Sequence, residues 1–359
     1  MPAIDYHIAT SADEVTLASI LHDTAMAGWV NMQLLRMPSY FSADALYGNT
    51  YTILARCGDE PVGLCRLQCL PVWVNGRATK ANYLAGLRIL PRFRHRLSVL
   101  HKGFTVLRSL CEDKQPLCFT SIAHDNATAR RLLEAGLPKM PRYTLLAGLH
   151  TLAFSSRQGQ PGQALRQATE ADIPALVAFH NDQAAQWQFA PLLDEAWLRN
   201  LSRAQALSIN DFLLYEEQGK LRTCVALWDQ RQLKQTVAQN YRAPLNIFRC
   251  VYNGYAHLTK RINLPSPGKA LNQAYLAFFA SNLETSASIA LLREALWHLS
   301  RRDIAVGVLG LAATNPLREV FQRTLRPTQY ETCIESVCFF GDQAVELDDR
   351  PPQPEAALL

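Results

Sequence analysis

Apolar positions in the first half of this 359-residue chain alternate between short runs typical of strands and amphipathic stretches typical of helices. Asn75-Gly76 predicts a hairpin, because these residues readily adopt the positive φ angles of a type I′ turn. Gly136 predicts the end of a helix. The expected strands span 51–56, 61–71, 72–74, 77 onward, 83–90, 119–126 and 138–154, and the expected helices span 15–21, 99–112 and 127–134. A loop rich in aromatic and Met residues is expected over 29–51.

The second half shows a similar order of patterns. Two helical patterns come first, and strands and helices then alternate to the end of the half. A less regular insert is expected over 229–266. The expected helices span 173–180, 187–207, 288–299 and 317–325, and the expected strands span 211–215, 221–228, 274–281 and 304–313.

The two halves repeat one another. Residues 9–13 read ATSAD and residues 168–172 read ATEAD, and a helical pattern follows each. Each copy leads downstream to a buried strand that ends in Asn126 or Asn315 and turns into a basic helix. The repeat is longer than the 20–50 residues of a solenoid unit, so it predicts a duplicated domain.

The domain boundaries follow from this repeat and from composition. With 48% hydrophobic residues, the chain is able to build two cores of ordinary size. We expect a first domain over 1–155, a linker over 156–163 and a second domain over 164–347. Residues 348–359 are rich in Pro and acidic residues and predict a flexible tail; if ordered, that tail would be able to fill a groove.

Charge and cysteine usage narrow the class of protein. The net charge of +5 suits an anionic small molecule and is too small to argue for nucleic acid. No apolar run is long enough to cross a membrane, and the N-terminus has no signal-like segment. The nine cysteines are scattered, and the closest pair, Cys65 and Cys69, lacks partners at zinc spacing. We therefore expect free thiols in the cytoplasm, no metal, no nucleic acid and no membrane partner.

Two segments of the first half carry a recognisable motif order. Residues 87–99 (LRILPRFRHRLSV) join a strand, a proline, a basic loop and a helix, and residues 125–137 (DNATARRLLEAGL) join a strand end, an asparagine, a helix and a glycine. This order resembles the Gcn5-related N-acetyltransferase (GNAT) superfamily, here as a tandem pair. The resemblance implies an α/β fold of two tandem domains, each a mixed central sheet flanked by helices.

The resemblance also implies a donor, acetyl-CoA or another acyl-CoA, and residues that bind it. The strand before the loop would bind the pantetheine arm and polarise the thioester, and the helix start would bind pyrophosphate. The alternatives are a solvated basic helix start and, for the asparagine, a helix N-cap. The residues implied are Leu87, Arg88, Ile89, Arg94, His95, Arg96, Leu97, Ser98, Val99 and Asn126.

The chain departs from the family pattern in both halves. Leu97 and Val99 take the places of two phosphate-loop glycines. The corresponding loop of the second half, 282–288, has no arginine and contains an acid. The family tyrosine that protonates the departing thiolate is replaced by Leu132 in the first half and Phe321 in the second. We therefore expect the second half to be a degenerate copy.

Three side chains are candidates for catalysis. His124 ends the buried strand close to the expected thioester and suits a general base. Tyr83 and Tyr143 are candidate hydroxyl donors. The alternatives are a strand-end histidine bonded to backbone and two core tyrosines. The aromatic segments 29–41 and 187–197 are expected to face each other across a groove for the acceptor, or to pack together.

The leading interpretation is an acyl-CoA-dependent N-acyltransferase, first of all an acetyltransferase, acting on an amine of a small molecule or a peptide. The alternative is a non-catalytic module that binds acyl-CoA or another ligand. A transferase that uses a charged RNA donor is the third class, and the lack of a broad basic stripe counts against it. A homodimer stays open.

Overall fold

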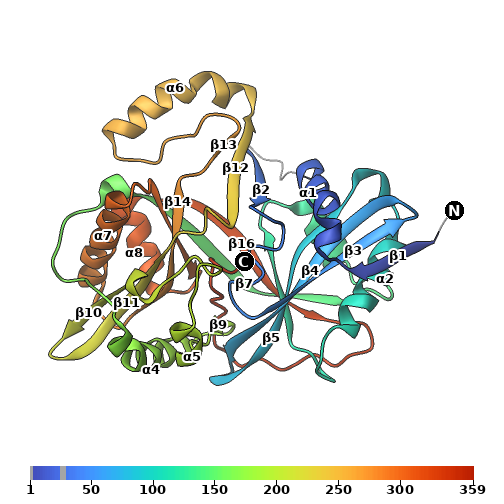
Figure 1. Ribbon diagram of the computed structural model, residues 1–359, viewed down its shortest axis with the longest axis horizontal. Helices are drawn as coiled ribbons and strands as arrows, with labels where there is room; N and C mark the ends of the chain where they lie inside the picture. The colour runs from blue at the N-terminus through green and yellow to red at the C-terminus, as the bar shows by residue number, and fades with distance from the viewer. Residues whose placement is uncertain (1–2, 25–29) are drawn as a thin grey trace.

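The computed structural model describes residues 3–24 and 30–359 as two halves joined by one sheet (Figure 1). The strands of the first half are β1 (Ile4–Ile8), β2 (Val30–Arg36), β3 (Asn49–Cys57), β4 (Glu60–Val74), β5 (Arg77–Ile89), β6 (Cys118–Ala123) and β7 (Arg142–Ser155). Its helices are α1 (Glu14–Asp23), α2 (Leu97–Ser109) and α3 (Ala127–Leu133).

The second half supplies the remaining elements. Its strands are β8 (Arg166–Gln167), β9 (Ala190–Pro191), β10 (Phe212–Glu217), β11 (Lys220–Trp228), β12 (Lys234–Tyr241), β13 (Lys269–Ala270), β14 (Gln273–Ser281), β15 (Val306–Ala312) and β16 (Thr328–Cys338). Its helices are α4 (Ile173–Ala184), α5 (Glu195–Arg199), α6 (Ala243–Leu258), α7 (Thr285–Arg301) and α8 (Pro316–Leu325). The mixed α/β fold with tandem halves, expected from the sequence, is confirmed.

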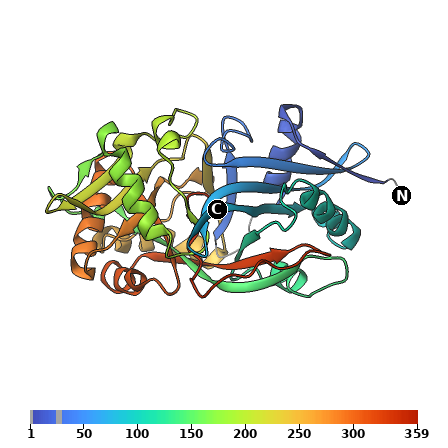
Figure 2. The same ribbon diagram turned by 90° about the horizontal axis from the view of Figure 1, so that it is seen from below.

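One mixed sheet runs through both halves in the order β1-β3-β4-β5-β6-β16-β7-β15-β14-β11-β10-β8, and β9 pairs with β4 off this path. The last strand of the chain, β16, lies between β6 and β7 of the first half, with Ile334 opposite both Ser121 and Ala147. On its other side β7 pairs with β15, with Leu152 opposite Leu309. Figure 2 shows the long strands of β7 and β16 crossing from one half to the other. The halves therefore exchange strands.

The repeat seen in the sequence forms the same local structure twice. Thr10 and Asp13 make a capping box before α1, and Thr169 and Asp172 make one before α4. The hydroxyl and the carboxylate satisfy backbone N–H groups that a helix start leaves unpaired. The two strand-end asparagines also act alike, because each accepts a backbone N–H in the first turn of the next helix.

Three expectations about the connecting segments are wrong. The pattern over 187–207 predicted a long helix, but only α5 forms there. Ala190 pairs with Trp73 of β4 instead, and tertiary pairing overrides the local pattern. The insert over 229–266 is regular, with β12 and α6. The aromatic loop after α1 contains β2, which pairs with β12; Trp29 lies outside the described residues.

The predicted linker is packed against the second half. Ser155 and Ser156 are buried, and the backbone N–H of Ser156 donates to the carbonyl of Ala305. A side chain at Gly159 would collide with the backbone of Trp297 in α7. The segment is therefore a fixed connection. The domain boundaries themselves stay predictions.

The C-terminal segment, expected from its composition to be flexible, is also ordered. Ala356, Ala357 and Leu358 are buried, and Figures 1 and 2 both show the chain end at the centre of the molecule, between the halves. Acidic and proline residues do not prevent this, because the carboxylate of Glu355 accepts the backbone N–H groups of Phe278 and Ala357. The alternative that the tail fills a groove is the correct one.

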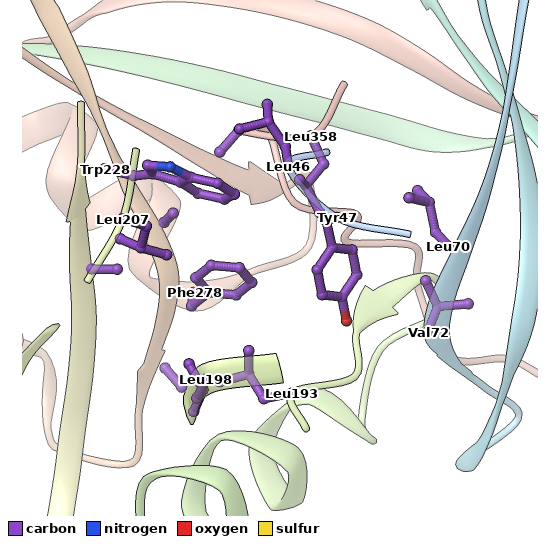
Figure 3. Packing of buried hydrophobic residues seen from close by; sticks show 14 of the residues in the cluster. Leu46, Tyr47, Leu70, Val72, Leu193, Leu198, Leu207, Trp228, Phe278 and Leu358 are labelled. Atoms are coloured by element: carbon purple, nitrogen blue, oxygen red, sulfur yellow. The ribbon is translucent and has the colours of Figure 1, made fainter. Parts of the chain in front are cut away.

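A central apolar cluster connects the two halves. In Figure 3 Leu46, Tyr47, Leu70 and Val72 of the first half face residues of the second half and the chain end. Those residues include Leu193, Leu198, Leu207, Trp228, Phe278 and Leu358. Burial of this kind stabilises by about 25 cal/mol per Å² of apolar surface, so the halves fold onto a shared core. None of the helices described here is long and apolar enough to cross a membrane.

Candidate functional site

Strands β5 and β6 separate in the first half and leave an open wedge. They pair in parallel over three positions, ending at Leu84 opposite Thr120. Beyond this point β5 continues to Ile89 on β4 alone. The register of β4 against β5 shifts between Leu64 and Arg66, and Gly86, at φ +61°, lies in this bulge. Backbone groups at the β6 side of β5 are therefore turned toward the wedge.

Gly86 borders free space in the wedge. Among residues 3–24 and 30–359, a Cβ atom built on Gly86 would meet only the Cδ atom of Arg66 within 4 Å, at 3.8 Å. The positive φ favours glycine, and the missing side chain allows another molecule to approach the backbone closely. The wedge is thus the natural place on the first half for an extended ligand.

The second half contains a wedge of the same kind, but the chain itself fills it. Strands β14 and β15 also pair in parallel over three positions and then separate, after Tyr275 opposite Val308. Residues 275–278 read YLAF where residues 83–86 read YLAG, so Phe278 takes the place of Gly86. Phe278 also has a positive φ, 51°, but it is only 1% exposed and stacks on Trp228 and Phe212.

The C-terminal segment fills the rest of this second wedge. The backbone N–H of Phe278 donates to Glu355 at 2.7 Å, and that of Ala312 donates to the side chain of Gln353 at 3.0 Å. A Cβ atom on Gly310 of β15 would lie 2.6 Å from the Cβ of Ala356. The chain itself therefore occupies in the second half the space that stays free beside Gly86 in the first.

The predicted cofactor-binding residues line one side of the first wedge and the start of α2. Leu87 is exposed on β5, next to Arg88 and Ile89. Arg94 donates from Nε to the carbonyl of Ile89 at 3.0 Å, and the Arg96 guanidinium lies 5.1 Å from the centre of the Phe93 ring. The structure thus brings the strand end and the basic loop together.

The two residues that replace the family's glycines point in different directions. Val99 is 4% exposed and packs into the core below the loop, and its carbonyl accepts the Tyr6 hydroxyl at 2.8 Å. Leu97 is 40% exposed at the first position of α2, beside the exposed His95 and Ser98. The valine side chain is therefore directed away from any anion at the helix start, and only Leu97 adds bulk there.

Asn126 acts as a helix cap. It precedes α3, and its side-chain carbonyl accepts the N–H of Ala129 at 3.2 Å. This confirms the N-cap alternative. It does not test a further contact to a ligand.

The structure does not bring the three predicted catalytic residues together. Tyr83 lies in the central cluster, donating or accepting a 2.6 Å hydrogen bond with Ser121, and burial raises its pKa to about 12. Tyr143 packs against Phe104 of α2, in the same apolar cluster as Leu84 and not in the cluster of Tyr83. Burial raises the pKa of Tyr143. His124 is exposed, with Nδ1 3.7 Å from the Sγ atom of Cys333. Of the three, Tyr83 is closest to the point where the strands separate.

A charged cluster beside the wedge was not predicted. Asp44 accepts Nη2 of Arg66 at 2.5 Å and Nη1 of Arg36 at 3.3 Å, all through Oδ1. Arg66 in turn lies against Gly86. Burial raises the pKa of Asp44 to about 6, although the Arg36 charge acts in the opposite direction. No spacing or motif connects residues 36, 44 and 66, so the sequence held no signal for this cluster.

A second ionisable group joins the cluster from the other half. Lys234 of β12 lies opposite Arg36 of β2, and its Nζ atom donates to the carbonyl of Ala357 at 2.8 Å. Burial, assisted by the Arg36 charge, lowers the pKa of Lys234 to about 7. Burial also raises the pKa of Glu355. Charged groups of both halves and of the chain end therefore lie near Arg36.

The two aromatic segments that were expected to face each other across a groove pack on other parts of the chain. In segment 187–197, Trp197 contacts Tyr47 edge-on at 5.1 Å between ring centres, and Phe189 stacks on Phe119 at 4.3 Å. In segment 29–41, Tyr40 and Phe41 pack on the cluster that contains Leu17 and Ile20. This favours the packing alternative. A different, shallow hollow lies between α2 and the sheet beside Leu87–Ile89. Its walls are apolar and include Tyr6, Ile53, Leu64, Leu100, Phe104 and Leu107.

Known structures share this arrangement at low sequence identity. No protein-family model and no curated protein matches the sequence. N-myristoyltransferase from Saccharomyces cerevisiae with bound myristoyl-CoA is 10% identical and has a TM-score of 0.61, with 98% of this chain and 87% of that chain covered. A GCN5-related N-acetyltransferase from Sphaerobacter thermophilus is 12% identical, with a TM-score of 0.56 and coverage of 95% and 98%. The fold is that of the GNAT superfamily.

A third similar structure is a GCN5-related region within a larger protein. The glucosamine N-acetyltransferase region of a fungal multi-domain β-N-acetylglucosaminidase aligns with 94% of this chain and 38% of that chain, at 11% identity and a TM-score of 0.62. Each of these alignments spans nearly the whole chain, so the GNAT similarity extends over both halves. The family resemblance drawn from residues 87–99 and 125–137 is thereby confirmed at the level of fold.

Proposed function

We propose that this chain is an acyl-CoA-dependent N-acyltransferase that uses the wedge of its first half. The donor would be acetyl-CoA or another acyl-CoA, and the acceptor an amine of a small molecule or a peptide. The observation that carries this proposal is the free space beside Gly86, at the position that Phe278 fills in the second half. The GNAT fold supports it, as does the myristoyl-CoA bound by one of the similar structures.

The residues present fit such a donor. Backbone groups of Leu87, Arg88 and Ile89 lie beyond the part of β5 that pairs with β6, and those on the wedge side are placed for the pantetheine arm and the thioester carbonyl. The start of α2 offers a helix dipole and N–H groups to the pyrophosphate, with Arg94 and Arg96 adding charge. The inward direction of the Val99 side chain keeps this helix start accessible despite the missing glycines.

N-acyl transfer forms a bond between nitrogen and the acyl carbon and breaks the bond between that carbon and sulfur. The amine loses a proton and the thiolate gains one. Asp44 is a half-buried carboxylate that is connected to the wedge through Arg66, and a pKa of about 6 leaves it largely ionised at neutral pH. We assign it to binding and deprotonating the amine. Tyr83 is the candidate proton donor, and His124 and Tyr143 rank behind it because of their positions.

The apolar hollow under α2 bears on the length of the acyl chain. It lies beside the strand segment that would hold the thioester, and its lining is apolar. An acetyl group needs no such space, whereas a longer acyl chain would be stabilised there by burial. The nine free thiols favour a reducing compartment, so a cytoplasmic location stays part of the proposal.

Calorimetric titration of the full chain with acetyl-CoA and with longer acyl-CoAs tests the proposal. We expect one site per chain, because Phe278 and the C-terminal segment occupy the second wedge. Two sites would contradict the assignment of the second half. No binding at millimolar ligand would contradict the proposed donor.

A non-catalytic ligand-binding module is the second candidate. It is favoured by Leu132, a partly buried apolar residue of α3 at the position of the family's proton-donating tyrosine. The two candidates are separated by product formation. Acyl-CoA binding at one site without acylation of any amine, across a panel of small amines and N-terminal peptides, would support the module.

A further inference from the structure

Helix α6 carries an uncovered apolar face. The exposed positions include Ile247, Phe248, Val251, Tyr255 and Leu258. At 100° per residue these five fall within about a third of the helix circumference, so they form one stripe. Val251 is 71% exposed and Leu258 85%. Isolated apolar residues are common on surfaces, but a continuous stripe on one helix indicates a surface that meets something else.

The helix does not need this stripe for its own stability. Its opposite side faces the molecule, where Ala256 is buried and the Asn253 side chain bonds both backbone groups of Leu264, at 2.8 and 3.0 Å. Arg157 of the inter-half connection donates to the carbonyl of Ala256 at 3.3 Å and to Asn263 at 3.0 Å. Figure 1 shows α6 at the outer edge of the molecule, beyond β12 and β13. The stripe is therefore presented outward by a helix that is fixed from behind.

The stretch of chain that contains α6 carries only positive charges. No Asp or Glu occurs among residues 230–283, a stretch of 54 residues with seven Lys and Arg. Without these seven, the rest of the chain has 29 Lys and Arg against 31 Asp and Glu, so this segment accounts for the positive net charge. Arg242 directly precedes α6, Lys260 follows it, and Lys269 lies on the neighbouring β13; all three are exposed.

We propose that α6 docks this protein onto an anionic lipid bilayer. An interfacial helix buries a stripe of large apolar side chains at the level of the headgroups, while basic residues beside it meet the anionic lipids. A second copy of the chain fits less well, because two α6 segments would bring only like charges together across an apolar contact. The sequence predicted no membrane partner because no segment spans a bilayer. Surface docking requires no such span.

Flotation of the full-length protein with vesicles tests this directly. The probes are vesicles of phosphatidylglycerol and phosphatidylcholine in equal amounts, and vesicles of phosphatidylcholine alone. We expect binding to the first and at least tenfold weaker binding to the second. Added salt should weaken the binding, because surface charges are screened. Each basic residue near the surface should change the affinity about fivefold, and Lys260→Gln measures that step.

A matched pair of variants separates the stripe from general effects. Val251→Asp places a charge in the stripe, and Val15→Asp places the same charge on α1, where the valine is 82% exposed. We expect Val251→Asp to reduce vesicle binding at least tenfold and Val15→Asp to leave it unchanged. Equal behaviour of the two variants, or no binding of the wild type to anionic vesicles at low salt, would overturn the proposal.

Sedimentation velocity without lipid tests whether a second copy of the chain, and not a bilayer, covers the stripe on α6. A monomer is expected for the wild type. A dimer that Val251→Asp converts to a monomer would assign the stripe to a second copy and overturn membrane docking. The vesicle assay measures no acyl transfer, so its failure leaves the proposed enzymatic function standing, and failure of that function leaves this result standing.

Discussion

The backbone N–H of Phe278 donates a 2.7 Å hydrogen bond to the carboxylate of Glu355. This contact attaches the end of the chain to the bulge of β14, at the position that Gly86 leaves free in β5. One duplicated wedge is thus filled by the chain and the other is available. This asymmetry is the reason why we expect one donor site per chain.

The C-terminal segment should contribute measurably to stability. Leu358 is 7% exposed within the central cluster, so Leu358→Ala is expected to lower the free energy of unfolding by about 2 kcal/mol, the low end for a buried leucine because the site is near the chain end. Leu258→Ala removes the same atoms from a site that is 85% exposed and should change stability by less than about 0.5 kcal/mol. Denaturant unfolding of both variants measures the difference; equal values would mean that the tail does not pack as described.

Donor binding should require the missing side chain of Gly86, and not only its positive φ. Gly86→Ala introduces a methyl group into the wedge and a strained φ of +61°, costing about 1–2 kcal/mol. Gly58→Ala is the matched control. Gly58 has φ +64° and lies in the turn between β3 and β4, and no atom of the described residues lies within 4 Å of its Cβ position.

Both glycine variants are expected to lose similar stability, and only Gly86→Ala should weaken acyl-CoA binding, by about tenfold or more. Thermal unfolding and calorimetric titration measure the two effects separately. Acyl-CoA binding that is equally strong in both variants would place the donor elsewhere.

Much of the site's framework was predictable, because its signals are local. The bulged strand, the proline that ends it and the basic loop occupy adjacent positions, so residues 83–99 alone indicate them. The two capping boxes depend on positions three residues apart and were visible as a repeated pentapeptide. The exchange of Gly86 for Phe278 was also present, in the repeated Tyr-Leu-Ala.

Other features depend on contacts between distant parts of the chain. Nothing local in β16 indicates that it inserts between β6 and β7, about 200 residues earlier. Asp44 and Arg66 meet only because the loop before β3 folds back onto β4. The packing of the chain end against Phe278 likewise requires the wedge to exist first. Periodicity and composition carry no information on such pairings.

The arginines at the start of α2 should contribute to donor affinity by charge. Arg94→Ala and Arg96→Ala are each expected to weaken acyl-CoA binding at least several-fold, and added salt should reduce the difference from wild type. Arg323→Ala, on the exposed side of α8, is the control because its charge lies far along the chain, in the second half. Affinity that does not change in the two α2 variants would remove the loop from the site.

Asp44 should produce a pH dependence of turnover. A base must be unprotonated to accept the proton of the amine, so kcat at saturating substrates is expected to fall as the pH drops through about 6, the raised pKa of this carboxyl. An ordinary aspartate would move that fall to about pH 4. Asp44→Asn should remove the fall and lower kcat by about 100-fold or more.

The Asp44 test needs a folding control, because Arg66 is buried and loses its charged partner in Asp44→Asn. Asp13→Asn removes a carboxylate that is bonded to Arg56 and belongs to the capping box before α1. It should cost about 1 kcal/mol of stability and keep the wild-type pH profile. A wild-type profile with no inflection near pH 6 would exclude Asp44 as the base, whatever the variants do.

Tyr83 should affect turnover through its hydroxyl, whereas Tyr143 should not. Burial raises the pKa of Tyr83 to about 12, so the group is protonated at working pH and able to donate toward the wedge, where it now bonds Ser121 at 2.6 Å. Tyr83→Phe is expected to lower kcat by 10- to 100-fold with little change in acyl-CoA affinity. Tyr143→Phe removes the same atom on the other face of the sheet, under α2, and should leave kcat unchanged. Steady-state kinetics on both variants measures the difference. Equal kcat values would mean that Tyr83 is a core residue without a role in turnover and that solvent protonates the departing thiolate.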